Sequence, residues 1–203
     1  MSSAMSAIRL RRLNRWQAEG LEEDLADLYV ESTDSHSGEE YRNRQGFLRR
    51  LTSDVRRPGF AMLIAETTTL AGCAFGFPVS RDGSWWLGFD GVLPHSVEQL
   101  TASGHVFAIT EIVVHPHEHD QDVVRRLEER LLADHHASLG ATLVPEADLA
   151  AYAAFQSRGW QEIGEVRRPP GPAVSRALVL ALGRTAATPD GLTHNARTQR
   201  PER

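Results

Sequence analysis

The chain has 203 residues, which fits one compact domain, and all 22 of its basic residues are arginine. The absence of lysine excludes a Schiff-base lysine, a lysine general base and the lysine of a phosphate-binding loop. The net charge of −5 argues against a general nucleic-acid binder, whose affinity would depend on a positive surface.

Apolar spacing along the chain predicts one strand, two helices, three strands, a helix, a strand, a helix and two strands. Strands are expected at 7–12, 60–66, 70–79, 105–116, 141–145, 161–168 and 175–182. Helices are expected at 21–30, 39–55, 123–138 and 149–158. Residues 80–104 follow neither the helical nor the strand period of apolar residues, and they are interpreted as an excursion between two strands. This order predicts a mixed α/β fold, with a twisted sheet of six or seven strands flanked by about four helices.

The domain is expected to span residues 7–182, because the composition turns polar and aperiodic beyond it, which predicts a disordered tail over 183–203. Cys73 is the one cysteine, so no internal disulfide can form and a reducing cytoplasm is the expected compartment. Arg11 and Arg12 form a twin-arginine pair, but no apolar segment follows them. No apolar run approaches the roughly 20 residues that a membrane-spanning helix needs, so no membrane partner is expected.

Three motifs in this order carry a resemblance to a known family. Leu70-Ala71-Gly72 with Gly76, the stretch TEIVVHP at 110–116, and FQSRGW at 155–160 resemble the third strand, the fourth strand and the late helix-to-strand junction of the GNAT superfamily of acyl-CoA-dependent N-acyltransferases. The resemblance covers about residues 7–182 and implies a GNAT-like fold. It also implies transfer of an acetyl group from acetyl-CoA, as cosubstrate, to a primary amine of a small molecule or a peptide.

The resemblance also places the coenzyme A site. In the family, a pattern Arg/Gln-x-x-Gly-x-Gly/Ala opens the helix whose free N–H groups hold the pyrophosphate. Contacts to acetyl-CoA are thereby implied for Val113, Val114, His119, Asp120, Gln121, Asp122, Val123, Val124 and Arg125. The loop is degenerate, since His119, Asp122 and Val124 stand where the pattern has Arg/Gln, Gly and Gly/Ala. Asp120 or Asp122 could instead cap the helix and occupy those N–H groups.

Acyl transfer to an amine needs a base, and Glu111 is the ionisable residue inside the otherwise apolar strand 105–116. Partial burial would raise its pKa; the alternative is an outward-facing strand residue. His105, at the start of that strand, is a second candidate. The family's general acid is a Tyr, and its position holds Phe155 here; Tyr152 lies nearly one helical turn away.

Other interpretations stay open at this point. The altered loop and Phe155 also fit a catalytically inactive GNAT-fold protein that acts as a binding or regulatory module. The histidines around 115–119 carry no recognised ligand spacing, so no metal site is expected. The acidic loop 31–40 would suit a cationic amine acceptor, and the alternative is an ordinary polar loop. Trp85 and Trp86 look like an exposed pair that forms a cleft wall or a homodimer contact, with one of them in the core.

Overall fold

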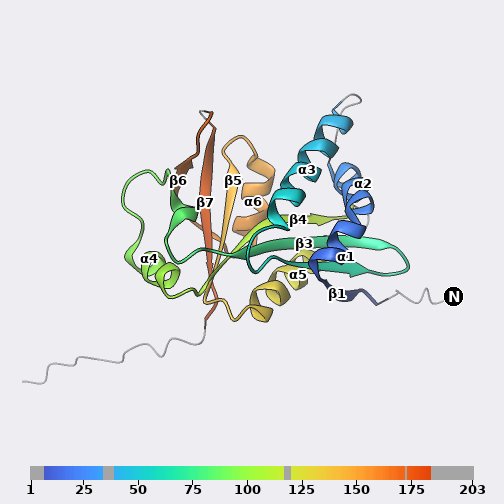
Figure 1. The fold of residues 1–203 in the computed structure, drawn as a ribbon, viewed down its shortest axis with the longest axis horizontal. Helices are drawn as coiled ribbons and strands as arrows, with labels where there is room; N and C mark the ends of the chain where they lie inside the picture. The colour runs from blue at the N-terminus through green and yellow to red at the C-terminus, as the bar shows by residue number, and fades with distance from the viewer. Residues whose placement is uncertain (1–6, 34–38, 117–119, 172, 184–203) are drawn as a thin grey trace, which may run out of the picture.

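The computed structural model describes residues 7–33, 39–116, 120–171 and 173–183 (Figure 1). The predicted tail falls almost wholly on residues 184–203, which lie outside the described residues. No helix in the described part of the chain is long and apolar enough to cross a membrane.

A seven-stranded sheet forms the centre of the fold, in the order β1-β2-β3-β4-β5-β7-β6. The strands are β1 (Arg9–Leu13), β2 (Ala61–Glu66), β3 (Leu70–Pro78), β4 (Val106–Val114), β5 (Leu139–Pro145), β6 (Gln161–Arg167) and β7 (Val174–Ala181). Neighbouring strands run antiparallel except β4 and β5, which are parallel and joined through a helix. The mixed α/β sheet of seven strands confirms the predicted fold class.

Six α-helices surround the sheet in the described residues, two more than the sequence indicated. They are α1 (Arg15–Gly20), α2 (Glu22–Ser32), α3 (Glu40–Asp54), α4 (His95–Ala102), α5 (Asp120–Asp134) and α6 (Leu149–Ser157). Helix α1 has six residues, too few for an apolar stripe, and is fixed by a capping box between Asn14 and Gln17. Helix α4 lies in the excursion 80–104, where glycine and proline obscure its short period.

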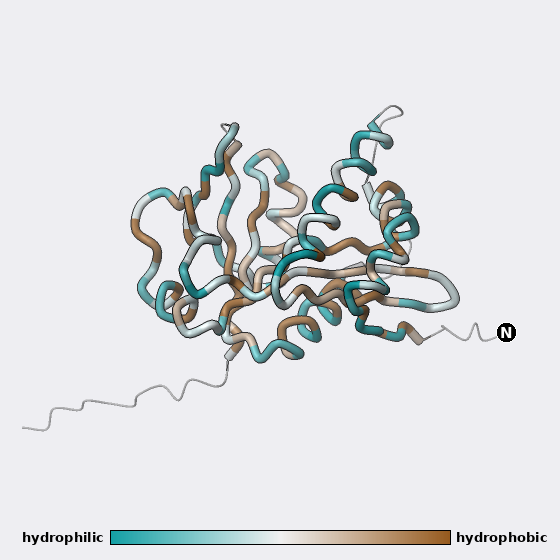
Figure 2. The backbone as a smooth tube through the Cα atoms, in the orientation of Figure 1, coloured by the Kyte–Doolittle hydropathy of each residue, from teal (hydrophilic) through white to brown (hydrophobic). Residues whose placement is uncertain are grey.

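The core packs on both faces of the sheet. Helices α2 and α3 press Leu25 and Phe47 onto one face of β2–β4, next to Phe75. Helix α5 presses its apolar stripe, which includes Leu127, onto the other face, next to Leu63. Figure 2 shows hydrophobic residues running through the central strands, whereas much of α3 is hydrophilic. The helices therefore bury one side each and leave the other to solvent.

Trp85 and Trp86 are both buried, with exposed fractions of 8% and 5%, so the expectation of an exposed pair is wrong. They occupy a short 3₁₀ turn (Ser84–Trp86) that folds the excursion back over β3 and β7. Trp86 Nε1 donates to Thr101 Oγ1 at 3.0 Å, which ties the turn to α4. A local pattern could not reveal this, because the covering partners come from distant segments.

An irregularity in β4 determines where the sheet opens. Glu111 lies opposite Phe75 and Ile109 lies opposite Gly76, so Thr110 is an extra residue without a partner on β3, a β-bulge. A Cβ on Gly76 would stand 1.8 Å from the Ala108 carbonyl oxygen, so only glycine permits this close pairing.

Beyond the bulge, β4 and β5 separate (Figure 1). Their pairing covers only 106–108 and 139–141. The Thr142 hydroxyl donates to the Ile109 carbonyl at 2.8 Å and satisfies this acceptor where the ladder stops. The second half of β4 consequently has one edge that no strand covers.

A buried ion pair beside this opening holds α5, α6 and the start of β6 together. Arg158 Nε lies 2.8 Å from Glu128 Oε2, and their side chains are 9% and 4% exposed. Trp160 Nε1 donates to the other oxygen of Glu128. One buried carboxylate therefore satisfies a charged and a neutral donor.

We predict that Glu128→Ala lowers the free energy of unfolding by about 3–5 kcal/mol, because it leaves the Arg158 charge and the Trp160 N–H without their acceptor. Urea denaturation measures this. The control is Glu129→Ala, an exposed neighbour on the same helix, with an expected change within about 0.5 kcal/mol. Equal losses in the two variants would contradict the role given to the buried pair.

Candidate functional site

A cavity of about 330 Å³ fills the opening between β4 and β5. Its walls come from α2, the second half of β4, β5, Val124 near the start of α5, and α6. Segments from the beginning, middle and end of the chain thus meet there. Because a mostly pre-formed concave site at a break in a sheet is a usual place for a ligand, this cavity is the candidate active site.

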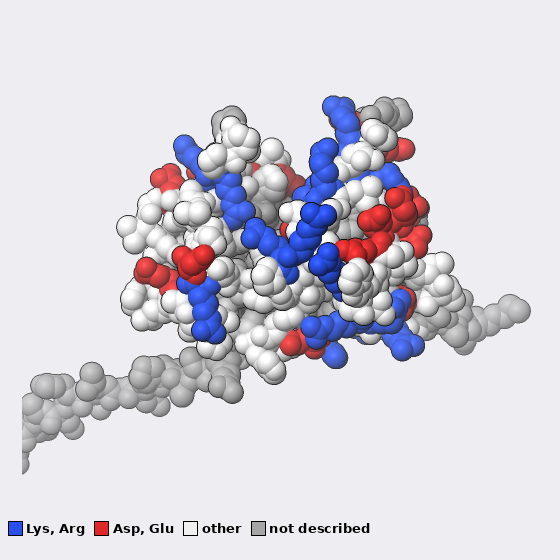
Figure 3. All heavy atoms as spheres, in the orientation of Figure 1, with Lys and Arg blue, Asp and Glu red and all other residues white. Residues whose placement is uncertain are grey.

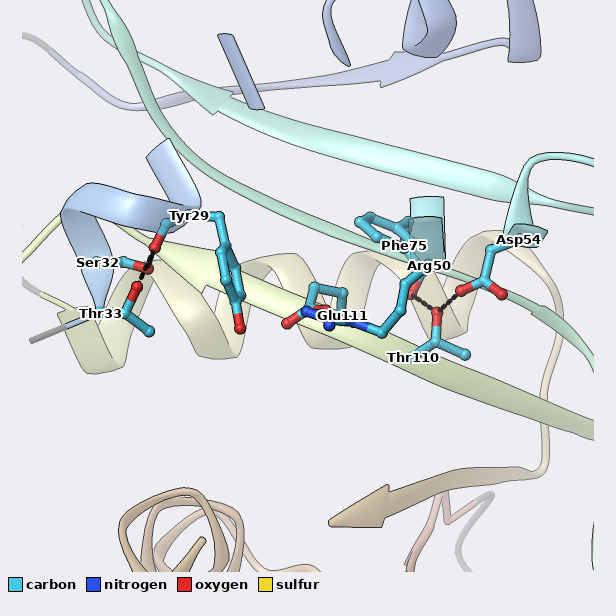
Figure 4. A network of polar contacts seen from close by, with 8 residues as sticks. All are labelled: Tyr29, Ser32, Thr33, Arg50, Asp54, Phe75, Thr110 and Glu111. Atoms are coloured by element: carbon cyan, nitrogen blue, oxygen red, sulfur yellow. Dashed lines mark hydrogen bonds and ion pairs between the residues drawn. The ribbon is translucent and has the colours of Figure 1, made fainter. Parts of the chain in front are cut away.

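Glu111 enters the site from β4. Its side chain is 16% exposed and forms an ion pair with Arg50 of α3, whose Nη2 and Nε lie 3.1 Å and 3.2 Å from Glu111 Oε2. Figure 4 shows Glu111 between Arg50 and Tyr29. Burial raises the pKa of Glu111 above its ordinary value, the Arg50 charge opposes this rise, and Asp54 adds to it. The carboxyl predicted from sequence as the base is therefore partly desolvated and oriented.

Arg50 is held from two sides. Its guanidinium lies 5.3 Å from the centre of the Tyr29 ring, and that ring stacks on Phe47 at 4.9 Å. Desolvation lowers the pKa of Arg50, but Glu111 and Tyr29 outweigh it and raise the pKa overall. The arginine stays cationic and fixes the position of Glu111 Oε2.

The bulge residue is anchored separately. The Thr110 hydroxyl lies 2.6 Å from Asp54 Oδ2, at the end of α3, and 3.3 Å from the Phe75 carbonyl (Figure 4). Burial raises the pKa of Asp54 above its ordinary value, although Thr110 and two arginines oppose the rise. This contact connects the bulge in β4 to the helix that carries Arg50.

The uncovered edge of β4 presents backbone donors to the cavity. His115 N–H donates to the Ala71 carbonyl of β3 at 2.8 Å. In an antiparallel ladder every second residue bonds to the same neighbour, so Val113 N–H also faces β3. The N–H groups of Ile112 and Val114 then face the side from which β5 has departed. Of the two valines implied by the resemblance, Val114 has its backbone donor on the open side.

The implied coenzyme A loop is described only in part. His119 lies outside the described residues, and Asp120 begins α5. Gln121, Asp122 and Arg125 are exposed on the first turns of that helix, Val123 is buried in the core, and Val124 lines the cavity. The helix thus begins beside the cavity, with an exposed carboxylate in its first turn.

Arg126, the residue after Arg125, turns away from this loop. Its Nη2 donates to the Ile8 carbonyl at 3.0 Å, next to β1. Arg126 is thus engaged next to β1, which leaves Arg125 as the arginine of this helix turn that could offset the charge of Asp122.

Phe155 lines the cavity, where the resembling family has its acidic Tyr. Tyr152 does not replace it, because its hydroxyl donates to Glu162 Oε2 at 2.7 Å and accepts from Gln156 Nε2 at 2.8 Å, outside the cavity. Glu162 raises the pKa of Tyr152 above its ordinary value. No tyrosine hydroxyl from α6 therefore reaches the site.

His105 lies at the opposite end of β4 from the site. It precedes Glu111 by six residues, about 20 Å along a strand, and its Nδ1 lies 2.8 Å from Ser103 Oγ in an exposed position. The second candidate base is thus remote from the cavity.

The histidine-rich stretch forms no metal site in the part of the chain that is described. His115 Nε2 lies 3.3 Å from Glu31 Oε2, whereas His117 and His119 lie outside the described residues. Of the acidic loop 31–40, residues 34–38 are likewise outside them, and Glu39 pairs with Arg42 at 3.8 Å.

Sequence reasoning did not identify Arg50, Tyr29 and Asp54 as site residues. Each falls on a predicted helix, where its spacing looks like that of any exposed or half-buried residue. The available signal was Glu111 itself, because a carboxylate in an apolar strand needs a partner, but the partner is 61 positions away in the chain.

No protein-family model matches the sequence, and no curated protein matches it significantly. Solved structures do match. The PaiA N-acetyltransferase of Thermoplasma acidophilum, in complex with coenzyme A, is 12% identical with a TM-score of 0.53, over 84% of this chain and 98% of that one. A GNAT-family acetyltransferase of Bacillus cereus is 9% identical with a TM-score of 0.54, over 88% and 99%.

An aminoglycoside 6′-acetyltransferase of type Ii is 12% identical with a TM-score of 0.56, over 85% of this chain and 96% of that one. At these identities the likeness concerns the arrangement of helices and strands. The chain has the GNAT-superfamily fold.

Proposed function

We propose that the protein is an N-acetyltransferase that transfers an acetyl group from acetyl-CoA to a primary amine. The observation that carries the proposal is Glu111, a desolvated and oriented carboxylate at the point where β4 leaves β5. The GNAT fold supports the same reaction class, since the matched structures include acetyltransferases.

The residues of the cavity fit the two substrates. Acetyl-CoA supplies the activated acyl group as a thioester. Val114 N–H, on the uncovered edge of β4, donates to the thioester carbonyl oxygen and stabilises the charge that develops there. Exposed N–H groups at the start of α5 and the Arg125 side chain face the pyrophosphate, and Asp122 opposes it.

Glu111 accepts a proton from the ammonium form of the acceptor, directly or through one water molecule. The neutral amine nitrogen then forms the bond to the acyl carbon and releases its second proton to water, and the carbon–sulfur bond breaks to leave the amide. The departing thiolate takes a proton from solvent, because Phe155 has none to give. The raised pKa of Glu111 makes it a stronger base than an exposed carboxylate.

A catalytically inactive GNAT-fold protein is the alternative, and Phe155 together with Asp122 favours it. Such a protein would keep the scaffold and serve as a binding or regulatory module. The two functions differ in whether acetyl-CoA binds and is consumed.

Acetyl-CoA at 100 times its Kd should stabilise the protein by about 2.7 kcal/mol. For a chain of this size that corresponds to a rise in Tm of about 5–10 °C. Differential scanning fluorimetry with free acetate as the control measures it. Absence of a shift at millimolar acetyl-CoA would reject the enzyme and leave the inactive scaffold.

Glu111→Gln should lower kcat by about 10²–10⁴-fold, because the variant keeps the shape and loses the base. In the wild type, kcat should fall as the pH drops through the pKa of Glu111, which lies above the ordinary 4.5, and this limb should vanish in the variant. Steady-state assays of thiol release from pH 5 to 9 test this.

The matched control for this test is Glu162→Gln, which removes an exposed carboxylate bound to Tyr152 outside the cavity and should leave kcat unchanged. An equal loss in both variants would count against Glu111 as the base.

Asp122→Asn should tighten acetyl-CoA binding by about tenfold, since it removes a negative charge from the helix end that faces the pyrophosphate. Isothermal titration calorimetry measures the Kd. The control is Asp134→Asn, the same substitution at the opposite end of α5, which should leave the Kd unchanged. If Asp122→Asn is also without effect, the pyrophosphate does not bind at the start of α5.

A further inference from the structure

A second cavity, of about 550 Å³, adjoins the site on the side away from α5. The two cavities share Ile109, Thr110 and Leu143 in their walls. Four arginines line the second one: Arg49, Arg50, Arg57 and Arg168. Figure 3 shows basic side chains gathered in the hollow between α3 and the β6–β7 side of the molecule. This concentration of positive charge contrasts with the net charge of −5.

Arg57 and Arg168 are held by aromatic rings and not by carboxylates. The Arg57 guanidinium lies 5.0 Å from the Phe77 ring centre, the Arg168 guanidinium lies 4.7 Å from that of Trp85, and the two rings meet edge to face at 5.8 Å. Arg168 Nη2 also donates to the Trp85 carbonyl. Ring faces fix a guanidinium while leaving most of its N–H edge available.

Neither guanidinium has a carboxylate within 4.0 Å among the described residues. The acid in the same cavity, Asp54, is hydrogen-bonded by Thr110 at 2.6 Å, and it attracts Arg57 and Arg50 only through longer-range electrostatics. Desolvation lowers the pKa of Arg168, and the neighbouring charge of Arg57 lowers it further. Two like charges therefore repel each other in a partly desolvated site, and a bound anion would relieve this repulsion.

The strand register relates this pair to Glu111. Phe75 lies opposite Glu111, and Phe77, which supports Arg57, follows two residues later on the same face of β3. Two residues along a strand span about 7 Å. The arginine pair and Glu111 therefore lie over the same face of the sheet, on the two sides of the wall that the cavities share.

From these observations we infer that the acceptor amine carries an acidic group, a carboxylate or a phosphate, which Arg57 and Arg168 bind while the amine faces Glu111. The inference rests on the proposed amine acetylation and specifies its substrate class. Planar guanidinium groups suit both anions, because each offers paired N–H donors to two oxygens. The acceptor is thus a zwitterion, in contrast to the cationic amine that the acidic loop 31–40 would suit.

Calorimetric titration of the full-length protein tests the inference without turnover. The probes are O-phosphoethanolamine against ethanolamine, and β-alanine against propylamine. At least one acid-bearing amine should bind at least tenfold more tightly than its neutral partner, and 0.5 M NaCl should reduce the difference. A preference for O-phosphoethanolamine identifies phosphate as the group, and a preference for β-alanine identifies carboxylate. Equal binding of acidic and neutral amines overturns the inference.

Arg57→Gln and Arg168→Gln should each weaken binding of the preferred probe by about tenfold, the usual effect of losing one charged hydrogen-bond partner. The matched controls are the adjacent arginines. Arg56 lines a different pocket, and Arg167 lies 3.7 Å from Glu165, so Arg56→Gln and Arg167→Gln change the same charge outside the cavity. Equal weakening by variants and controls would show a general charge effect and overturn the assigned site.

Thiol-release assays separate this inference from the proposed function. If the acid-bearing amine binds through Arg57 and Arg168 but no amine is acetylated, the enzyme proposal fails and the anion site stands. If propylamine is acetylated with the same kcat/KM as β-alanine, and ethanolamine with the same as O-phosphoethanolamine, the enzyme proposal stands and the anion site fails.

Discussion

The separation of β4 from β5 is the feature on which the rest of the site depends. Two parallel strands normally continue their ladder, but the bulge at Thr110 turns the second half of β4 away after only three paired positions. The cost is a set of backbone groups without strand partners; Thr142 satisfies one of them. The result is a cavity inside the sheet, into which a rigid strand directs the N–H of Ile112 and the side chain of Glu111.

Electrostatics in the cavity are set by opposing effects on one carboxyl. Burial favours the neutral form of Glu111, whereas Arg50 favours the charged form, and the outcome is a raised pKa. Because Arg50 is itself fixed by Tyr29, helices α2 and α3 determine the position of the charge. The helices on this face therefore hold the strand's functional group as well as covering the core.

Arginine has a structural use here that lysine would not fill. Arg57 and Arg168 lie over the faces of Phe77 and Trp85, and stacking suits the planar guanidinium better than a compact ammonium. Because every basic residue is an arginine, the cations beside the cavity can be fixed by stacking on aromatic rings. The negative net charge of the chain does not reveal this group of arginines, because acidic residues elsewhere on the surface outweigh them.

The sequence by itself determined the succession of the strands along the chain, the longer helices and the placement of Glu111 in an apolar strand, because these follow from periodicity within short windows. It did not reveal the short helices α1 and α4 or the burial of both Trp85 and Trp86. Only the tertiary structure decided that Arg50 faces Glu111 and that Arg57 and Arg168 share a cavity. Those contacts join segments far apart in the chain, and local spacing carries no information about which of many surface arginines the folded sheet brings together.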